Sequence, residues 1–104
     1  MSKIKLQSEY DDLDKYENYL GDIYYYKKNT HIFHNPYGPA IICKDGRKYY
    51  YLNNLLSRLD GPARIWSNGT EEYWINNCYL TKEQFETHLE RLKYLGKEHL
   101  TCLI

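Results

Sequence analysis

The sequence predicts an α+β fold: an antiparallel β-meander of two to three hairpin repeats of about 23 residues, with a C-terminal amphipathic helix and a short N-terminal helix. Three observations predict it, namely an internal repeat, the turn dipeptides inside that repeat, and a capped apolar stripe near the C-terminus. A chain of 104 residues is long enough for one domain, so we expect residues 1–104 to form a single domain.

The repeat occupies residues 22–80. Gly38-Pro39-Ala40 aligns with Gly61-Pro62-Ala63, and the same offset aligns residues 50–54 with residues 73–77. Each unit ends in Asn-Asn and contains Asp-Gly or Asn-Gly, residues that tolerate the positive φ of tight hairpin turns. We therefore expect short strands near residues 22–27, 31–34, 40–43, 47–52, 55–58, 63–66, 70–75 and 78–80.

Two segments outside the repeat show helical patterns. Residues 8–21 predict a short helix, with Ser8 as a candidate N-cap and Gly21 as the stop. Its apolar positions recur at a spacing of three to four: Tyr10, Leu13, Tyr16 or Glu17, and Leu20. Thr81-Lys82-Glu83-Gln84 has the form of a capping box and is followed by an apolar stripe that ends at Gly96. Residues 81–95 are therefore predicted to form an amphipathic helix.

Composition limits the function. Fourteen basic residues balance fourteen acidic ones, so net charge gives no sign of a nucleic-acid binder, although residues 23–80 carry a local excess of +3. Mean hydropathy is −0.79 and the N-terminus lacks the apolar stretch of a signal peptide, so we expect no membrane span and a cytoplasmic location. Cys43, Cys78 and Cys102 form no C-x-x-C pair and are expected to be reduced thiols.

One stretch resembles a known family. Residues 57–74, from Ser57-Arg58-Leu59-Asp60-Gly61-Pro62-Ala63 to Trp74, are similar to the His-Arg-x-Asp-Gly-Pro-Ala β-hairpin repeats, distant relatives of MORN repeats. Such repeats occur in many phage and large-DNA-virus proteins. In this chain Ser57 replaces the usual His, and His34-Asn35-Pro36-Tyr37 stands at the corresponding place of the first unit. The resemblance implies a hairpin fold and a viral context, with the host-cell cytoplasm as location, and it implies no particular reaction.

Thirteen tyrosines are the strongest lead to function. Strand alternation puts Tyr49 and Tyr51 on one face with Glu72 and Trp74, so that Tyr51 and Trp74 form equivalent rungs of an aromatic ladder. A ladder can stack against bases, sugars or a partner's side chains. The alternative is that tyrosine only covers a thin sheet. For a protein partner, the expected contact residues are the aromatic and Arg side chains Tyr51, Trp74, Trp66, Arg58 and Arg64.

A second lead is a set of cations within the tyrosine-rich segment. Aromatic rings interleaved with cations suit an anionic ligand such as a nucleotide or a short nucleic acid, although lysines on strands also protect exposed edges from aggregation. The candidate anion-binding residues are Lys27, Lys28, Lys44, Arg47 and Lys48. His31 and His34 are three apart and fall on opposite faces of a strand, so we expect no metal site. No catalytic constellation and no cofactor motif is present, so we expect no enzyme.

These observations lead to two hypotheses. The first is a small non-enzymatic viral interaction module that binds a host protein and inhibits a component of an antiviral defence. The alternative is a protein that binds or sequesters an anionic nucleotide or short nucleic acid. A two-repeat array also leaves its sheet edges uncovered unless helices cap them, so pairing of copies into a homo-oligomer through those edges is a further expectation.

Overall fold

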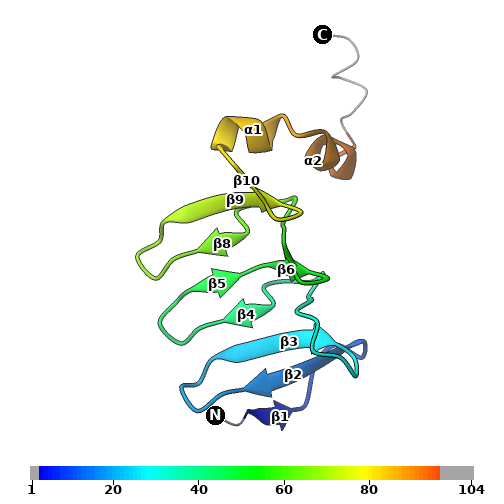
Figure 1. Cartoon of the computed structure of the whole chain (residues 1–104), viewed down its shortest axis with the longest axis vertical. Coiled ribbons are helices and arrows are strands. Elements are labelled where there is room, and N and C mark those ends of the chain that lie inside the picture. The colour runs from blue at the N-terminus through cyan, green and yellow to red at the C-terminus, as the bar shows by residue number, and fades with distance from the viewer. Residues whose placement is uncertain (1–2, 97–104) are drawn as a thin grey trace.

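A computed structural model describes residues 3–96 of the chain. Its main element is an antiparallel sheet in the order β1-β2-β3-β4-β5-β8-β9-β10 (Figure 1), flanked by the short β6–β7 hairpin and followed by two short helices. The strands are β1 (Ile4–Leu6), β2 (Leu13–Glu17), β3 (Ile23–Lys27), β4 (Ile41–Ile42), β5 (Lys48–Tyr49), β6 (Tyr51–Leu52), β7 (Leu55–Leu56), β8 (Arg64–Ile65), β9 (Glu71–Ile75) and β10 (Cys78–Leu80). The helices are α1 (Lys82–Glu86) and α2 (Leu89–Tyr94). An α+β class with an antiparallel sheet and helical structure near the C-terminus is confirmed.

The predicted N-terminal helix over residues 8–21 is wrong. Residues Leu13–Glu17 form β2, which pairs with β1 on one side and β3 on the other. Gly21 has the positive φ (88°) expected after a helix, but it belongs to the tight β2–β3 connection, where Asn18 Oδ1 accepts from the N–H groups of Leu20 and Asp22 at 2.9 Å. A helix of this length is marginal alone, whereas the strand gains hydrogen bonds from two neighbours.

The predicted helix over residues 81–95 is interrupted. The capping box forms as expected, because Thr81 Oγ1 accepts from the Gln84 N–H at 3.1 Å and Gln84 Oε1 accepts from the Thr81 N–H at 2.9 Å. The chain then leaves the helical conformation at His88, whose backbone is extended and whose Nδ1 caps the start of α2 by accepting from the Glu90 N–H at 3.2 Å. Two short helices therefore replace the single one.

The predicted strands near 31–34 and 47–52 also differ from the structure. Residues 31–34 contribute only an isolated bridge between Phe33 and Tyr26. Residues 47–52 divide at Tyr50 into β5, which belongs to the main sheet, and β6, which pairs with β7. The strands β3, β4, β7, β8, β9 and β10 lie within the predicted ranges.

Backbone hydrogen bonds recur along the chain at the same offset as the sequence repeat. The bonds of one segment and their counterparts in the next have nearly the same lengths: Ala40 N–H to Tyr49 O and Ala63 N–H to Glu72 O are both 2.9 Å, and Asn35 N–H to Tyr51 O and Arg58 N–H to Trp74 O are 3.0 and 3.1 Å. The two segments that align in sequence therefore make the same backbone contacts.

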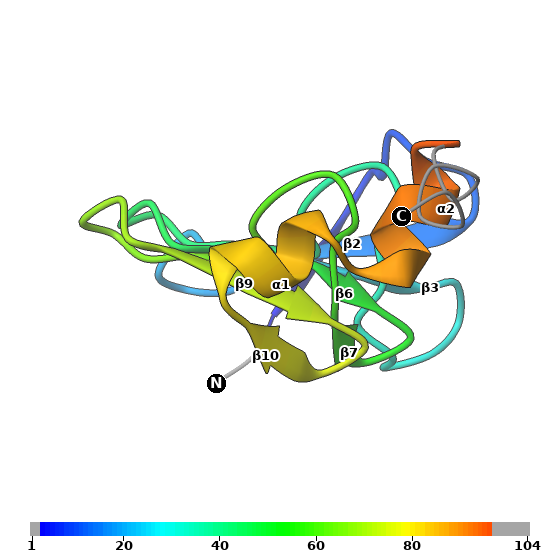
Figure 2. The same ribbon diagram turned by 90° about the horizontal axis from the view of Figure 1, so that it is seen from above.

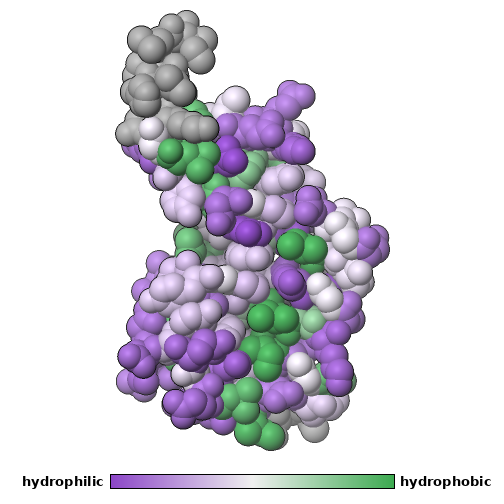
Figure 3. Space-filling view, turned by 180° about the vertical axis from the view of Figure 1, so that it is seen from behind, coloured by the Kyte–Doolittle hydropathy of each residue, from purple (hydrophilic) through white to green (hydrophobic). Residues whose placement is uncertain are grey.

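The sheet has two distinct faces. One, the loop face, is covered by the loops at 35–39 and 58–62 and by the helices, and it carries the fully buried Ala40 and Ala63. On this face Tyr73 packs on Phe85 of α1, with ring centroids 4.6 Å apart. Figure 2 shows these loops and α2 on one side of the sheet, and Figure 3 shows hydrophobic surface among hydrophilic residues on the back of the molecule. The core is therefore a thin layer, since the described structure measures 52 × 31 × 19 Å.

Candidate binding surface

The opposite side of the sheet is lined by aromatic side chains. Cross-strand pairing aligns Tyr16 with Tyr24, Ile41 with Tyr49 and Arg64 with Glu72 in one row. Strand alternation then adds residues two positions further along the strands. Phe33 lies opposite Tyr26 and Tyr79 lies opposite Trp74, so both belong to the same side. We call this surface the aromatic face; its members are Tyr16, Tyr24, Tyr26, Phe33, Tyr49, Tyr51, Trp66, Trp74 and Tyr79, together with Arg64 and Glu72.

One end of the aromatic face is a packed cluster around Phe33. Its ring lies 5.0 Å from that of Tyr26, 5.5 Å from that of Tyr51 and 6.1 Å from that of Tyr24. The Lys3 ammonium lies 4.7 Å from the centroid of the Tyr24 ring. Tyr51 is therefore partly packed within the protein. The sequence predictions gave Phe33 no role, although its alignment with another apolar residue, Leu56, at the repeat offset is typical of a packed position.

The centre of the aromatic face is organised by Glu72. Trp66 Nε1–H donates to Glu72 Oε2 at 2.7 Å, and Trp74 Nε1–H donates to Glu72 Oε1 at 3.0 Å. Arg64 Nη1 lies 3.7 Å from the same carboxylate, and its guanidinium sits 4.2 Å from the centre of the Trp66 ring. Burial raises the pKa of Glu72, but the two indole hydrogen bonds and the Arg64 charge outweigh it and hold that pKa below its ordinary value. A carboxylate thus fixes both indoles beside a cation.

Tyr79 of β10 extends this surface to the last strand. Its ring lies 5.2 Å from that of Trp74 and its side chain is 63% exposed. Trp66, Trp74 and Arg64, three of the predicted contact residues, therefore lie together on the same face as Tyr51, and Tyr79 is a further member.

Arg58 lies elsewhere. Its guanidinium stacks 4.0 Å from the centre of the Tyr50 ring, and Tyr50 points to the loop face. Arg58 Nε–H donates to Asp60 Oδ1 at 2.8 Å and Nη1–H donates to the Pro62 carbonyl at 3.1 Å. Arg58, Tyr50 and Asp60 line an open pocket of about 490 Å³ together with Pro39, Leu52 and Tyr94. The predicted rim of Tyr51 and Trp74 therefore contains Arg64 but not Arg58.

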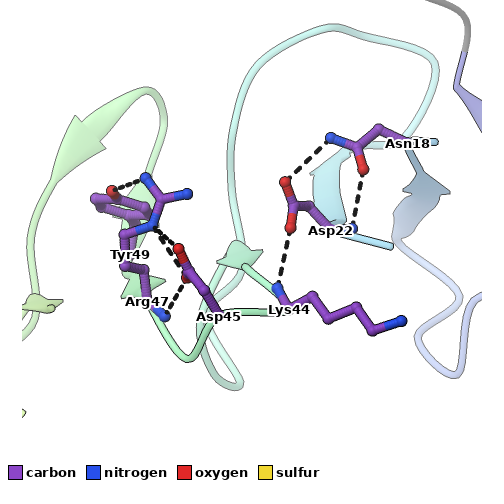
Figure 4. A network of polar contacts seen from close by, with 6 residues as sticks. All are labelled: Asn18, Asp22, Lys44, Asp45, Arg47 and Tyr49. Carbon is purple, nitrogen blue, oxygen red and sulfur yellow. Dashed lines mark hydrogen bonds and ion pairs between the residues drawn. The ribbon is translucent and has the colours of Figure 1, made fainter. Parts of the chain in front are cut away.

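The predicted anion-binding cations fall into separate groups. Lys44 and Arg47 belong to the β4–β5 turn, where the Lys44 N–H donates to Asp22 Oδ1 at 2.9 Å and Arg47 Nε–H donates to Asp45 at 2.9 Å (Figure 4). Lys27 and Lys28 lie at the far end of β3. The last cation, Lys48, pairs across the strands with Ile42 and Ile65. The structure does not bring the five into one patch.

The described part of the chain offers little other chemistry. Within residues 3–96 no three His, Cys, Asp or Glu side chains gather in a way that could hold a metal ion. Cys43 is buried and Cys78 exposed, both as free thiols, and Cys102 lies outside the described residues. Over the same range no helix has the length and apolar character needed to cross a bilayer.

Comparison of the chain with family models, with curated proteins and with solved structures found no match.

Proposed function

We propose that this chain is a non-enzymatic interaction module that binds another protein through its aromatic face. The observation that carries the proposal is the Glu72 carboxylate, which holds Trp66 and Trp74 at 2.7 and 3.0 Å beside Arg64. Trp, Tyr and Arg are the residue types that dominate protein-binding energy. Side chains already held in place lose little conformational entropy on binding, so this cluster is suited to a tight contact.

The shape of the molecule supports a protein partner rather than a small ligand. The aromatic face spreads over strands from β2 to β10. An aromatic surface spread over so many strands buries area against another surface more readily than it encloses a small molecule. A hairpin repeat would explain why aromatic residues recur along this face, because each repeat unit would place an aromatic pair on it. The resemblance to phage and large-DNA-virus repeats supports a host protein, and within that class an antiviral defence component, as the partner.

The alternative, a nucleotide or short nucleic acid, has less support. Its five cations lie in separate groups, and Arg58, which faces the loop-face pocket, is already paired with Asp60. Titration calorimetry with a panel of nucleotides distinguishes the two hypotheses. An anion-binding site gives saturable heat that decreases with added salt, and the protein-binding proposal expects none.

The proposal is tested with a Trp66→Ala/Trp74→Ala double variant. The wild-type protein is immobilised and partners are captured from host-cell lysate, and the double variant should lose the captured protein. A matched control, Tyr19→Ala/Tyr94→Ala, removes two exposed tyrosines that lie outside the aromatic face and should retain it. Thermal unfolding of each variant separates loss of binding from loss of fold. Equal capture by wild type and the indole variant would contradict the proposal.

A further inference from the structure

Two hairpin turns in this chain make the same contact with the preceding hairpin. In the first, the Asn54 N–H donates to the Phe33 carbonyl at 2.9 Å and the Phe33 N–H donates to Asn54 Oδ1 at 2.7 Å. In the second, the Asn77 N–H donates to the Leu56 carbonyl at 2.9 Å and the Leu56 N–H donates to Asn77 Oδ1 at 2.8 Å. Each turn asparagine thus satisfies the backbone N–H and C=O of one residue, Phe33 or Leu56, whose peptide groups point out of their own hairpin.

Tyr79 stands at the third such position. One repeat offset separates Phe33 from Leu56, and the same offset separates Leu56 from Tyr79; β10 is the last strand of the sheet. In a two-residue hairpin the residues that flank the turn, here Ile75 and Cys78, form the hydrogen-bonded pair, so the next pair directs its peptide groups outward. Tyr79 is opposite Trp74 in that next pair, and the outward Trp74 carbonyl indeed accepts from the Arg58 N–H at 3.1 Å. The N–H and C=O of Tyr79 therefore point away from β9, at the free edge.

Among residues 3–96, no strand pairs with the outer edge of β10 at Tyr79. Cys78 and Tyr79 are exposed, and α1 packs through Phe85 on Tyr73, which belongs to the loop face. Figure 2, which looks down on this end of the molecule, shows β10 uncovered by α1 and α2. No turn asparagine within residues 3–96 fills the position that Asn54 and Asn77 fill at the two earlier sites.

We propose that the outward peptide of Tyr79 is a docking site for a β-hairpin of a different protein, whose turn carries an asparagine in the left-handed conformation. The two internal contacts define the chemistry of the occupant: one backbone N–H and one carboxamide oxygen presented together by a residue with φ near that of Asn54 (64°) and Asn77 (67°). A second copy of this chain is a poor occupant, because both Asn-Asn turns are already engaged and the N–H of Asn29, the remaining turn asparagine with positive φ, donates to Asp14 at 2.8 Å.

This site differs from the aromatic face in its chemistry. It depends on a backbone N–H and C=O, whereas the proposed function depends on the two indoles that Glu72 holds. The Trp66→Ala/Trp74→Ala variant should therefore still bind a hairpin at β10. Failure of one proposal leaves the other in place.

The probe is a backbone-cyclised peptide with the sequence of residues 70–80 and Ser in place of Cys78, which presents the turn that fills the Leu56 site. It is titrated into isotope-labelled full-length protein and followed by NMR. Saturable shifts should centre on the Tyr79 amide, whose hydrogen exchange should slow. A control peptide with Asn77→Gly keeps the turn conformation but lacks the carboxamide, and it should bind roughly five-fold more weakly.

Two protein variants complete the test. Tyr79→Pro removes the outward N–H and should abolish binding, whereas Tyr79→Ala removes only the ring and should retain it. If Tyr79→Pro fails to fold, the two peptides decide the matter alone. Equal affinity of the two peptides, or shifts that map to the indoles instead of β10, would overturn the proposal. So would a concentration-dependent dimer of the free protein that Tyr79→Pro dissolves, because the occupant would then be a second copy.

Discussion

Asn77 and Leu56 are joined by a closed pair of hydrogen bonds, one from each backbone N–H, at 2.9 and 2.8 Å. The geometry depends on the left-handed backbone of Asn77, whose φ is 67°. In that conformation a short polar side chain and the N–H of the same residue can both form hydrogen bonds with one neighbouring residue's backbone. Leu56 is buried, so the bond to its N–H satisfies a donor that solvent does not reach freely.

Asn77→Ala should lower the free energy of unfolding by about 2 kcal/mol, because it leaves the Leu56 N–H unsatisfied and places a Cβ-bearing residue without a polar side chain in the left-handed region. Asn77→Gly relieves the backbone cost and should lower it by about 1 kcal/mol. Urea unfolding measures both. Asn76→Gly at the neighbouring turn position, whose φ is also positive (49°), is the matched control and should change stability by less than about 0.5 kcal/mol. Equal losses for all three variants would contradict the role of the Asn77 side chain.

Gly61 and Gly38 occupy equivalent positions of the two Gly-Pro-Ala motifs but differ in the space around them. A Cβ at position 61 would lie 2.8 Å from Arg58 Cζ, whereas at position 38 the nearest atom is Asn35 Nδ2 at 4.0 Å. Gly61→Ala should therefore push Arg58 off the Tyr50 ring and lower the free energy of unfolding by about 1 kcal/mol. Gly38→Ala should be neutral or slightly stabilising.

Urea unfolding gives the stability of the two alanine variants, and the NMR shifts of the Tyr50 ring protons report whether the guanidinium remains above the ring. Neither glycine has a positive φ, so backbone strain cannot account for a difference between them. Similar losses at both positions, or an unchanged Tyr50 ring in Gly61→Ala, would show that the close contact with Arg58 is relieved without cost.

The parts of the fold that sequence predicts are those set by local backbone chemistry. Asn53, Asn54, Asn76 and Asn77 all have positive φ, and the residue types alone indicate that conformation. Alternation along the strands likewise places Tyr49 and Trp74 on the same face, because a strand reverses its side-chain direction at each residue. Both features need only short stretches of chain, so no knowledge of distant partners is required.

The parts that sequence misses depend on distant partners. Leu13 and Tyr16 are three residues apart and fit a helical stripe, yet five cross-strand pairs with β3 decide that they belong to a strand. Arg58 follows β7, where the chain bends out of regular pairing, and alternation no longer fixes the direction of its side chain. Phe33 lies in a connection with a single bridge, so its place among the tyrosine rings follows from tertiary packing.

Glu72→Ala should release both indoles of the aromatic face. The change removes the acceptor of two half-buried N–H donors and leaves Arg64 without its carboxylate, so the free energy of unfolding should fall by about 2 kcal/mol. Near-ultraviolet circular dichroism should weaken because the Trp66 and Trp74 rings lose their fixed orientation. Glu72→Gln keeps one good acceptor and should give an intermediate effect.

The matched control for Glu72 is Glu71→Ala, since Glu71 is the exposed preceding residue and points to the other face of β9. It should leave the near-ultraviolet spectrum and stability unchanged within about 0.5 kcal/mol. An unaltered spectrum in Glu72→Ala would mean that packing alone orients the indoles, and it would remove the main support for a preorganised binding surface.

His34 makes the stability of the protein depend on pH through its hydrogen bond with the β6–β7 turn. Its Nδ1 accepts from the Asn53 N–H at 3.0 Å, and burial, followed by the charge of Lys27, lowers the pKa of His34 from the ordinary value of 6.5 in spite of the opposing effect of Asp12. Because the unfolded chain binds the proton more tightly, the stabilisation is complete above about pH 6.5 and decreases as the pH falls toward the lowered pKa of the folded state. The free energy of unfolding in urea, measured in steps of ~0.5 pH unit between about pH 7.5 and 5, should show this decrease.

The next hairpin of the chain suggests a substitution that isolates the contribution of His34 to the pH dependence of stability. At the equivalent position of the next hairpin Ser57 Oγ accepts from the Asn76 N–H at the same distance, 3.0 Å. His34→Ser should therefore preserve an acceptor for the Asn53 N–H while removing the titrating ring. The loss of stability between about pH 7 and 5.5, where histidine becomes protonated, should then be smaller than in the wild type. His31→Ser changes an exposed histidine of the same loop and should retain the wild-type slope. If His34→Ser keeps the full slope, another group is responsible, and the hydrogen bond from Asn53 does not depend on the protonation of His34.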